Sequence, residues 1–208
     1  LVKEQKILMM AQDTKDENQL ADAMGKLVSS CTYGGIDAST SPLFDIEYVF
    51  LKIRSKSVGS KVNLVLICPD DEKTEAKVSL DLDDINVTMT EEHINEVQIN
   101  DKVKIVFRYP ILSDLKGLVA NPTDVERVFH VLNKCISEIH FGDDVYQRSD
   151  MTEKDIDEFV DQLTTEQFEK MSDFFNSMPR LRHAVKVTNP KTKVKSEVVL
   201  EGLESFLG

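Results

Sequence analysis

The chain has 208 residues, of which 41% are hydrophobic and 30% are charged, and its formal net charge is −12. This composition is typical of a globular protein, and it excludes a disordered tail, a collagen-like repeat and a membrane protein. The negative charge also argues against a nucleic-acid partner, because contacts with phosphate groups need a basic surface.

The N-terminal part of the chain is expected to be helical. Apolar residues recur at helical spacing in Val2 to Asp13 and again in Asp16 to Tyr33. The pair Gly34-Gly35 ends the second of these helices. A third helix is expected from Leu43 to about Lys56, with Pro42 close to its first turn, where a missing N–H group does no harm.

The pattern then changes to the alternation of apolar and polar residues that is typical of strands. Lys61 to Cys68 and Thr74 to Leu82 flank the polar segment Pro69 to Lys73, which predicts a β-hairpin. Two further strands are expected at Asp83 to Met89 and at Gln98 to Tyr109, and a proline follows the second.

Helices return in the second half of the chain. Thr123 and Glu126 have the spacing of a capping box, which predicts a helix start, and this helix is expected to run to about His140. Two more helices are expected to begin at Thr152 and at Thr164. A second hairpin follows, with strands expected at residues 183–187 and 193–200.

These patterns predict an α+β fold of short amphipathic helices packed with antiparallel β-hairpins. Residues 1–110 are expected to form helices followed by a hairpin or meander, and residues 111–208 a helical part that ends in a hairpin and a short apolar tail. A shift of 120 residues places Val65 on Val185 and Leu80 on Leu200. This likeness leaves two hypotheses open: two similar helix-plus-hairpin units, or hairpins that resemble each other through strand propensity alone.

No motif in the sequence predicts a catalytic, cofactor-binding or metal site. The histidines lack the spacing of a metalloprotease pair, and Cys31, Cys68 and Cys135 lie too far apart for a disulfide framework, so buried thiols are expected. Met24 to Lys26 lacks the rest of a phosphate-binding loop. The acidic residues from Asp81 to Glu92 lack the spacing of a calcium loop, and a solvated surface is expected there.

Lys3 to Lys6 are polar or charged where the apolar region of a secretory signal would begin, so a cytosolic protein is expected. No apolar run approaches the roughly 20 residues of a membrane-spanning helix. The chain starts at Leu1, which leaves open whether an N-terminal segment is missing.

The remaining candidates for function are large apolar side chains on short segments. Phe174 and Phe175 are adjacent on one predicted helix and point about 100° apart, so both cannot lie at the centre of a narrow core stripe. Two hypotheses remain for such side chains: packing in the core, or anchoring a partner protein as in helix-in-groove recognition. The candidate partner-binding residues are Phe174, Phe175, Met178, Leu203, Phe206 and Leu207.

Four segments of the chain resemble a known family. Val2 to Met9, Tyr48 to Ser55, Ile67 to Pro69 and Leu200 to Leu207 resemble, in this order, the T4-type phage baseplate family. The resemblance covers nearly the whole chain and depends on the succession of segments, each of which is unspecific alone. Relatives look like zinc-knuckle proteins at the hairpin turns, with Cys-Pro-x-Cys. This chain keeps only Cys68-Pro69 of that motif, so the resemblance implies no metal here.

The resemblance implies a non-enzymatic protein of phage tail morphogenesis, an assembly factor or chaperone for the baseplate hub in the host cytoplasm. Its expected partners are baseplate hub proteins, with no cofactor and no small-molecule substrate. An alternative is a structural subunit of the hub that stays in the virion. A remote alternative is a hydrolase with an unrecognised carboxylate site, which needs a cleft holding at least two acidic side chains with mutually perturbed pKa values. Which hub protein is bound, and the oligomeric state, stay open.

Overall fold

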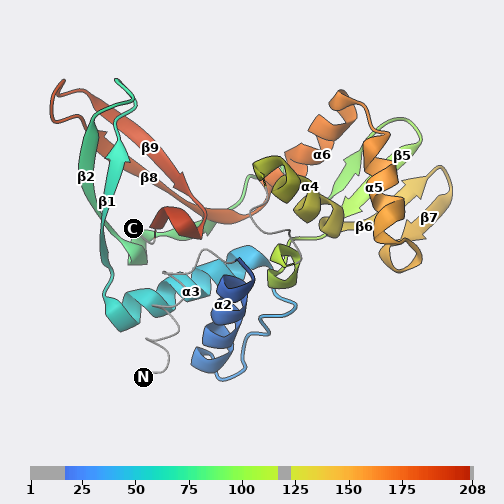
Figure 1. Cartoon of the computed structure of the whole chain (residues 1–208), viewed down its shortest axis with the longest axis horizontal. Helices are drawn as coiled ribbons and strands as arrows, with labels where there is room; N and C mark the ends of the chain where they lie inside the picture. The colour runs from blue at the N-terminus through green and yellow to red at the C-terminus, as the bar shows by residue number, and fades with distance from the viewer. Residues whose placement is uncertain (1–16, 117–122, 207–208) are drawn as a thin grey trace. The chain divides into compact units, whose positions relative to one another are not determined.

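The computed structural model describes residues 17–116 and 123–206, and its contacts divide the chain into two compact units (Figure 1). Unit 1 comprises Leu1–Thr88 and Pro179–Gly208, and unit 2 comprises Met89–Met178. This division differs from the predicted boundary at residue 110, because the C-terminal hairpin packs with the N-terminal part of the chain. The helix expected at residues 2–13 lies outside the described residues. Within the described ranges, no helix is long and apolar enough to cross a membrane.

The described elements confirm the α+β class, since α-helices accompany sheets whose strands are all antiparallel. The helices of unit 1 are α2 (Glu17–Cys31) and α3 (Leu43–Val58), which pack against each other. α3 also contacts strands and short 3-10 turns of unit 1, so it is the central helix of this unit (Figure 1). The side chains that these two helices bury include Ala21, Met24, Leu27, Val28, Ile46, Phe50 and Leu51.

The strands of unit 1 form two sheets. β1 (Lys61–Ile67) and β2 (Glu75–Asp81) make a two-stranded hairpin, as predicted. β3 (Asn86–Thr88), β8 (Arg180–Thr188) and β9 (Lys195–Glu201) make a three-stranded sheet in the order β3-β8-β9. The pairing of β3 with β8 brings together segments that lie more than 90 residues apart in the chain.

The two long hairpins of unit 1 resemble each other, but not in the register that the sequence indicated. Leu64 in β1 corresponds to Val185 in β8 at a shift of 121 residues, whereas Leu80 in β2 corresponds to Leu200 in β9 at a shift of 120. The turn of the second hairpin is therefore one residue shorter. The uniform shift of 120 residues paired Val65 with Val185, and this is wrong because Val65 is exposed and Val185 is buried. Both hairpins belong to unit 1, so the chain does not divide into two helix-plus-hairpin units.

The turns of these two hairpins are joined by hydrogen bonds. The Asp70 carboxylate accepts from Asn189 Nδ2 at 3.0 and 3.1 Å and from Thr192 Oγ1 at 2.6 Å. These donors hold the pKa of Asp70 below its usual value. Cys68 and Val187 are buried together in a small apolar cluster beside the turns. The hairpins are thus fixed to each other at their tips as well as along their buried faces.

Unit 2 is a four-stranded antiparallel sheet with helices. The strand order is β4 (Glu96–Gln98), β5 (Val103–Phe107), β6 (Ile136–Phe141) and β7 (Asp144–Gln147). The prediction that a helix continues to His140 is wrong. Residues 136–141 pair with β5 instead, because that pairing lets Ile136 and Ile139 enter the core of the sheet.

The helices of unit 2 begin where the capping boxes predicted. α4 (Asp124–Cys135), α5 (Glu153–Asp161) and α6 (Thr165–Ser177) are each preceded by a threonine that accepts from the backbone N–H three residues later. Side chains of all three helices share one core with the sheet. Its buried members are Ile99, Val103, Ile105, Phe107, Leu132, Cys135, Ile136, Ile139, Ile156, Val160, Met171 and Phe174.

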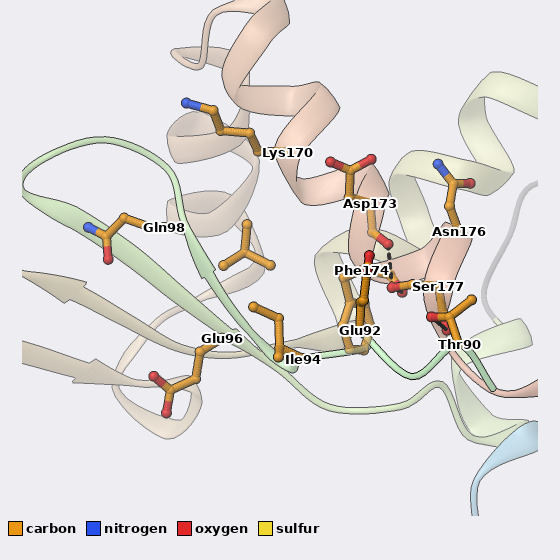
Figure 2. A pocket seen from close by; sticks show the side chains of 11 residues that line it. Thr90, Glu92, Ile94, Glu96, Gln98, Lys170, Asp173, Phe174, Asn176 and Ser177 are labelled. Atoms are coloured by element: carbon orange, nitrogen blue, oxygen red, sulfur yellow. Dashed lines mark hydrogen bonds between the residues drawn. The ribbon is translucent and has the colours of Figure 1, made fainter.

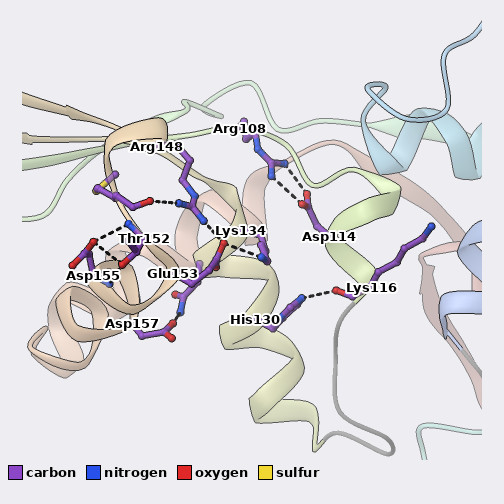
Figure 3. A network of polar contacts seen from close by, with 12 residues as sticks. Arg108, Asp114, Lys116, His130, Lys134, Arg148, Thr152, Glu153, Asp155 and Asp157 are labelled. Atoms are coloured by element: carbon purple, nitrogen blue, oxygen red, sulfur yellow. Dashed lines mark hydrogen bonds and ion pairs between the residues drawn. The ribbon is translucent and has the colours of Figure 1, made fainter.

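Polar contacts tie the connections of unit 2 to this core (Figure 3). Asp114 lies in the 3-10 turn η2 (Leu112–Leu115), and its two oxygens accept from Arg108 Nη1 at 2.6 Å and Nη2 at 2.9 Å. The same carboxylate accepts from the backbone N–H of Ile111 at 2.9 Å. A second group joins α4 to α5, where Glu153 pairs with Lys134 at 2.9 Å and with Arg148.

Replacing Asp114 with asparagine is expected to lower the free energy of unfolding by about 2 kcal/mol, because the charged, two-pronged bond to Arg108 is lost at a site where the carboxylate is only 5% exposed. Glu153→Gln is the matched control, since Glu153 is 54% exposed and its ion pairs contribute less than about 1 kcal/mol. Urea unfolding of both variants measures the difference. Equal losses in the two would contradict the assignment of Asp114 as the structural contact.

Candidate functional site

The apolar side chains proposed as anchors lie mostly in the core. Phe174, Leu203 and Phe206 are buried, with exposed fractions of 1%, 5% and 0%. Phe175 and Met178 are partly buried, and Leu207 lies outside the described residues. Phe174, Leu203 and Phe206 are therefore core residues, and Phe175 packs against the core of unit 2.

Two adjacent phenylalanines share the core of unit 2 because α6 covers a broad part of the sheet. The Phe174 ring stacks on Phe107 with 4.9 Å between centroids. The Phe175 ring meets Phe107 edge-on at 5.7 Å and Phe174 at 5.0 Å. Such a cluster gives each ring a favourable aromatic neighbour. Both rings therefore pack in or against the core of unit 2, although their side chains point about 100° apart on α6.

The Cys68-Pro69 turn is closed by its own hydrogen bonds. Cys68 is 1% exposed, and burial is the main reason that the pKa of its thiol is raised. Asp71 accepts from the N–H and hydroxyl of Thr74 at 2.9 and 2.6 Å, so its carboxylate is used within the turn. In the part of the chain that the structure describes, no cluster of three or more His, Cys, Asp or Glu side chains could hold a metal ion.

The acidic residues after β2 also serve local structure. Asp81 caps the 3-10 turn η1 (Leu82–Asp84) by accepting from the N–H of Asp83 at 3.0 Å. The Asp83 carboxylate accepts from Ser55 Oγ at 2.7 Å and from Lys56 Nζ at 2.8 Å, both on α3. Lys52 donates to three backbone oxygens of this segment at 2.9–3.1 Å. These contacts fasten η1 to the end of α3.

Glu47 and Glu204 are two carboxylates whose charges interact. Glu47 on α3 is partly buried, and its pKa is raised to about 7, first by burial and then by the charge of Glu204. Glu204 lies in the 3-10 turn η4 (Leu203–Phe206), whose first backbone N–H, at Leu203, donates to the Glu47 carboxylate. Glu47 therefore occupies the position of a capping carboxylate for η4, and Glu204 is exposed beside it.

A cavity of about 500 Å³ lies in unit 2 between α6 and the edge of the sheet (Figure 2). We call it the β4–α6 groove. One wall is formed by β4 and the loop before it, including Glu92, Ile94 and Glu96, and the other by α6, including Lys170 and Asp173. The sequence did not indicate this groove, because residues 90–95 have neither a motif nor a clear periodicity.

Hydrogen bonds fix the two walls of the groove to each other. Thr90 Oγ1 donates to the backbone oxygen of Ser177, at the end of α6, at 3.2 Å. His93 Nδ1 lies 2.9 Å from Ser177 Oγ. Because that hydroxyl donates to the Asp173 backbone oxygen at 2.6 Å, we assign the proton of the neutral imidazole to Nδ1. The His93 ring also stacks on Tyr109, and burial lowers its pKa. The loop before β4 is thus fixed to the end of α6 by contacts within unit 2.

The groove is acidic. Glu96 pairs with Lys104 at 2.8 Å, and Lys170 pairs with Glu166 at 3.2 Å, so these charges are balanced within the unit. Asp173 and Glu92 have no ion pair with any residue that the structure describes. Their charges stand on opposite walls of the groove, and Figure 2 shows them on α6 and on the loop, respectively.

A second surface feature is an apolar stripe on α4. Val125 and Val128 are 64% and 54% exposed, and Phe129, one turn on from Val125, is partly exposed while it stacks on Phe168 at 4.8 Å. Apolar residues continue at helical spacing from Val125 to Leu132 and beyond. Of these side chains in α4, Leu132 and Cys135 are buried, whereas Val125 and Val128 are exposed. We call Val125, Val128 and Phe129 the α4 stripe.

Comparison with known proteins identifies one family. The model of the family described as T4 bacteriophage base plate protein matches residues 1–208, the whole chain. Neither the curated proteins nor the solved structures include a match to the chain.

Proposed function

The chain belongs to the T4 bacteriophage base plate protein family, and from this premise we propose that it is a non-enzymatic protein that assists assembly of the baseplate hub. In this proposal it acts in the host cytoplasm as an assembly factor or chaperone, and it binds hub proteins. The family supplies the baseplate role. That the protein binds other proteins rather than catalysing a reaction is proposed from its surface.

The observation that carries this step is the α4 stripe. Val125, Val128 and Phe129 have the helical spacing of a packed face, yet the first two are more than half exposed. Exposed apolar side chains that form a stripe are typical of a surface that binds another protein. A hub subunit that lays an apolar face on the stripe would remove these side chains from water.

Replacing both Val125 and Val128 with aspartate is expected to abolish co-purification with hub proteins from infected cells, while the midpoint of thermal unfolding changes by only a few degrees, since both side chains are already exposed. Val65→Asp is the matched control, because Val65 is 56% exposed on a hairpin of unit 1. If hub proteins still co-purify with the double variant, or if the control is equally affected, the α4 stripe is not the binding surface.

The second candidate function is a structural subunit of the hub, and the same exposed stripe would serve a permanent contact equally well. Mass spectrometry of purified virions separates the two. An assembly factor that leaves is expected to be absent from the particle or present far below one copy per hub. Stoichiometric presence would defeat the chaperone proposal and favour the structural subunit. The remote hydrolase alternative has no comparable support, since the Glu47 carboxylate accepts a backbone hydrogen bond at the start of η4.

A further inference from the structure

Strand β4 has a free edge that faces the β4–α6 groove. The N–H of Ile99 donates to Val103 at 2.9 Å, and the N–H of Phe107 donates to Asn95 at 2.8 Å. In an antiparallel pair the hydrogen-bonded residues alternate, so Asn95, Val97 and Ile99 point their backbone groups at β5. Glu96 and Gln98 therefore point their N–H and C=O groups away from β5. Because β4 is the first strand of the sheet order, no strand within residues 17–116 and 123–206 pairs with these groups.

The groove has the form that an added strand needs. An extended segment paired with β4 would direct alternate side chains toward α6, about 6–7 Å apart. The groove already holds space there, between Ile94 and Val97 on one side and the surface of α6 on the other. Ile94 is 64% exposed, so an apolar side chain of the added strand would cover it.

The charges of the groove indicate the chemistry of the added strand. Asp173 and Glu92 lack an ion pair within the described part of the chain, and they lie on the two walls between which the strand would run. Lysine or arginine at alternate positions of the strand would pair with them. The formal net charge of −12 favours the approach of a basic segment at longer range.

We propose that the β4–α6 groove binds an extended basic segment of a partner protein by β-strand addition to β4. Backbone hydrogen bonds to Glu96 and Gln98 supply the register, and Asp173 and Glu92 select basic side chains. The inference rests on the proposed function only in assigning the segment to a hub protein. The groove is a surface distinct from the α4 stripe.

The test uses the purified full chain and two synthetic peptides. The probe is an eight-residue peptide of alternating lysine and valine, acetylated and amidated at its ends, and glutamate replaces lysine in the second peptide. Amide chemical shifts in NMR titrations are expected to change at Ile94, Glu96 and Gln98 with the lysine peptide, and the glutamate peptide is expected to bind at least tenfold more weakly. A lysine peptide with N-methyl groups on alternate amides is expected to lose binding, because it cannot complete the ladder.

Two variants test the site, each with its own control. Glu96→Pro removes an N–H group that faces the groove and leaves the backbone bonds to β5 intact, while it also removes the ion pair with Lys104. Asp173→Lys reverses a charge of the groove wall. Both are expected to raise Kd at least tenfold. Val145→Pro on the opposite edge strand β7 is the control for the first, since Val145 pairs with His140 one step from the tight turn and points its N–H away from β6. Asp161→Lys on α5 controls for the second.

The outcomes decide the proposal. Shift changes centred on another part of the chain, or equal weakening by the control variants, would overturn it. A dimer of the wild-type chain that Glu96→Pro dissociates would assign the edge to a second copy and would overturn it too. Thermal unfolding checks that each variant is folded, and Asp173→Lys keeps the test decisive if the proline variant is not. Since the peptide assay needs no phage, its failure is separate from that of the virion and co-purification experiments.

Discussion

Replacing Phe206 with alanine is expected to lower the free energy of unfolding by about 3–5 kcal/mol, the cost of a large cavity in a packed core. The ring is fully buried in η4, which packs against α3 and follows β9 directly. Urea unfolding followed by circular dichroism measures the loss. The prediction separates the two hypotheses for the C-terminal segment, because a partner-binding side chain could be removed with little effect on stability.

Val199→Ala on β9 is the matched control, since Val199 lies in the same unit and is 42% exposed. It is expected to cost less than about 1 kcal/mol. If the Phe206 variant is as stable as the wild type and has lost a binding partner, Phe206 is an anchor after all, and the packing of η4 against α3 is not maintained in solution.

Replacing Glu47 with glutamine is expected to stabilise the protein at pH 8 by at most about 3 kcal/mol and to have little effect at pH 4. The carboxyl has a pKa of about 7 in the folded chain, against an ordinary value of 4.5. The folded state therefore binds this proton more tightly than the unfolded state does. The corresponding stability is fully present below pH 4.5 and is lost as pH rises through 7. Glutamine remains neutral and keeps an oxygen for the Leu203 N–H, so it avoids that loss.

Chemical unfolding at the two pH values measures the effect. Glu204→Gln is the companion variant, because it removes the neighbouring charge but leaves the burial of Glu47, and it should give a smaller stabilisation of the same sign at pH 8. A Glu47 variant that is equally stabilised at both pH values would show that the carboxyl is not protonated near neutral pH in the native protein.

Local chemistry explains which elements could be predicted. The starts of α4, α5 and α6 follow from capping boxes, which depend on residues only three positions apart. The β1–β2 hairpin follows from alternation within two adjacent segments. The class of the fold needs no more than these patterns.

Pairings between distant segments could not be predicted from the same patterns. Residues 136–141 continue the apolar helical spacing of α4, and only the presence of β5 beside them makes a strand the better solution. The buried face of α3 carries Ile46, Phe50 and Leu51, and elements from both ends of the chain pack on this helix. The β4–α6 groove likewise depends on contacts between residues about 80 positions apart, such as His93 with Ser177.

The pairing of β3 with β8 has a consequence for the order of folding. Thr88 and Arg180 are register partners, so the two points where the chain leaves and re-enters unit 1 are neighbours on adjacent strands. Unit 2 is thus an insertion whose two ends lie close together. If unit 2 folds first, the effective loop between β3 and β8 shortens from about 90 residues to a few. The entropic cost of closing that loop then falls by roughly 3 kcal/mol. Folding of unit 2 would therefore favour the pairing of β3 with β8 in unit 1. We expect a short turn in place of unit 2 to join the same two strands.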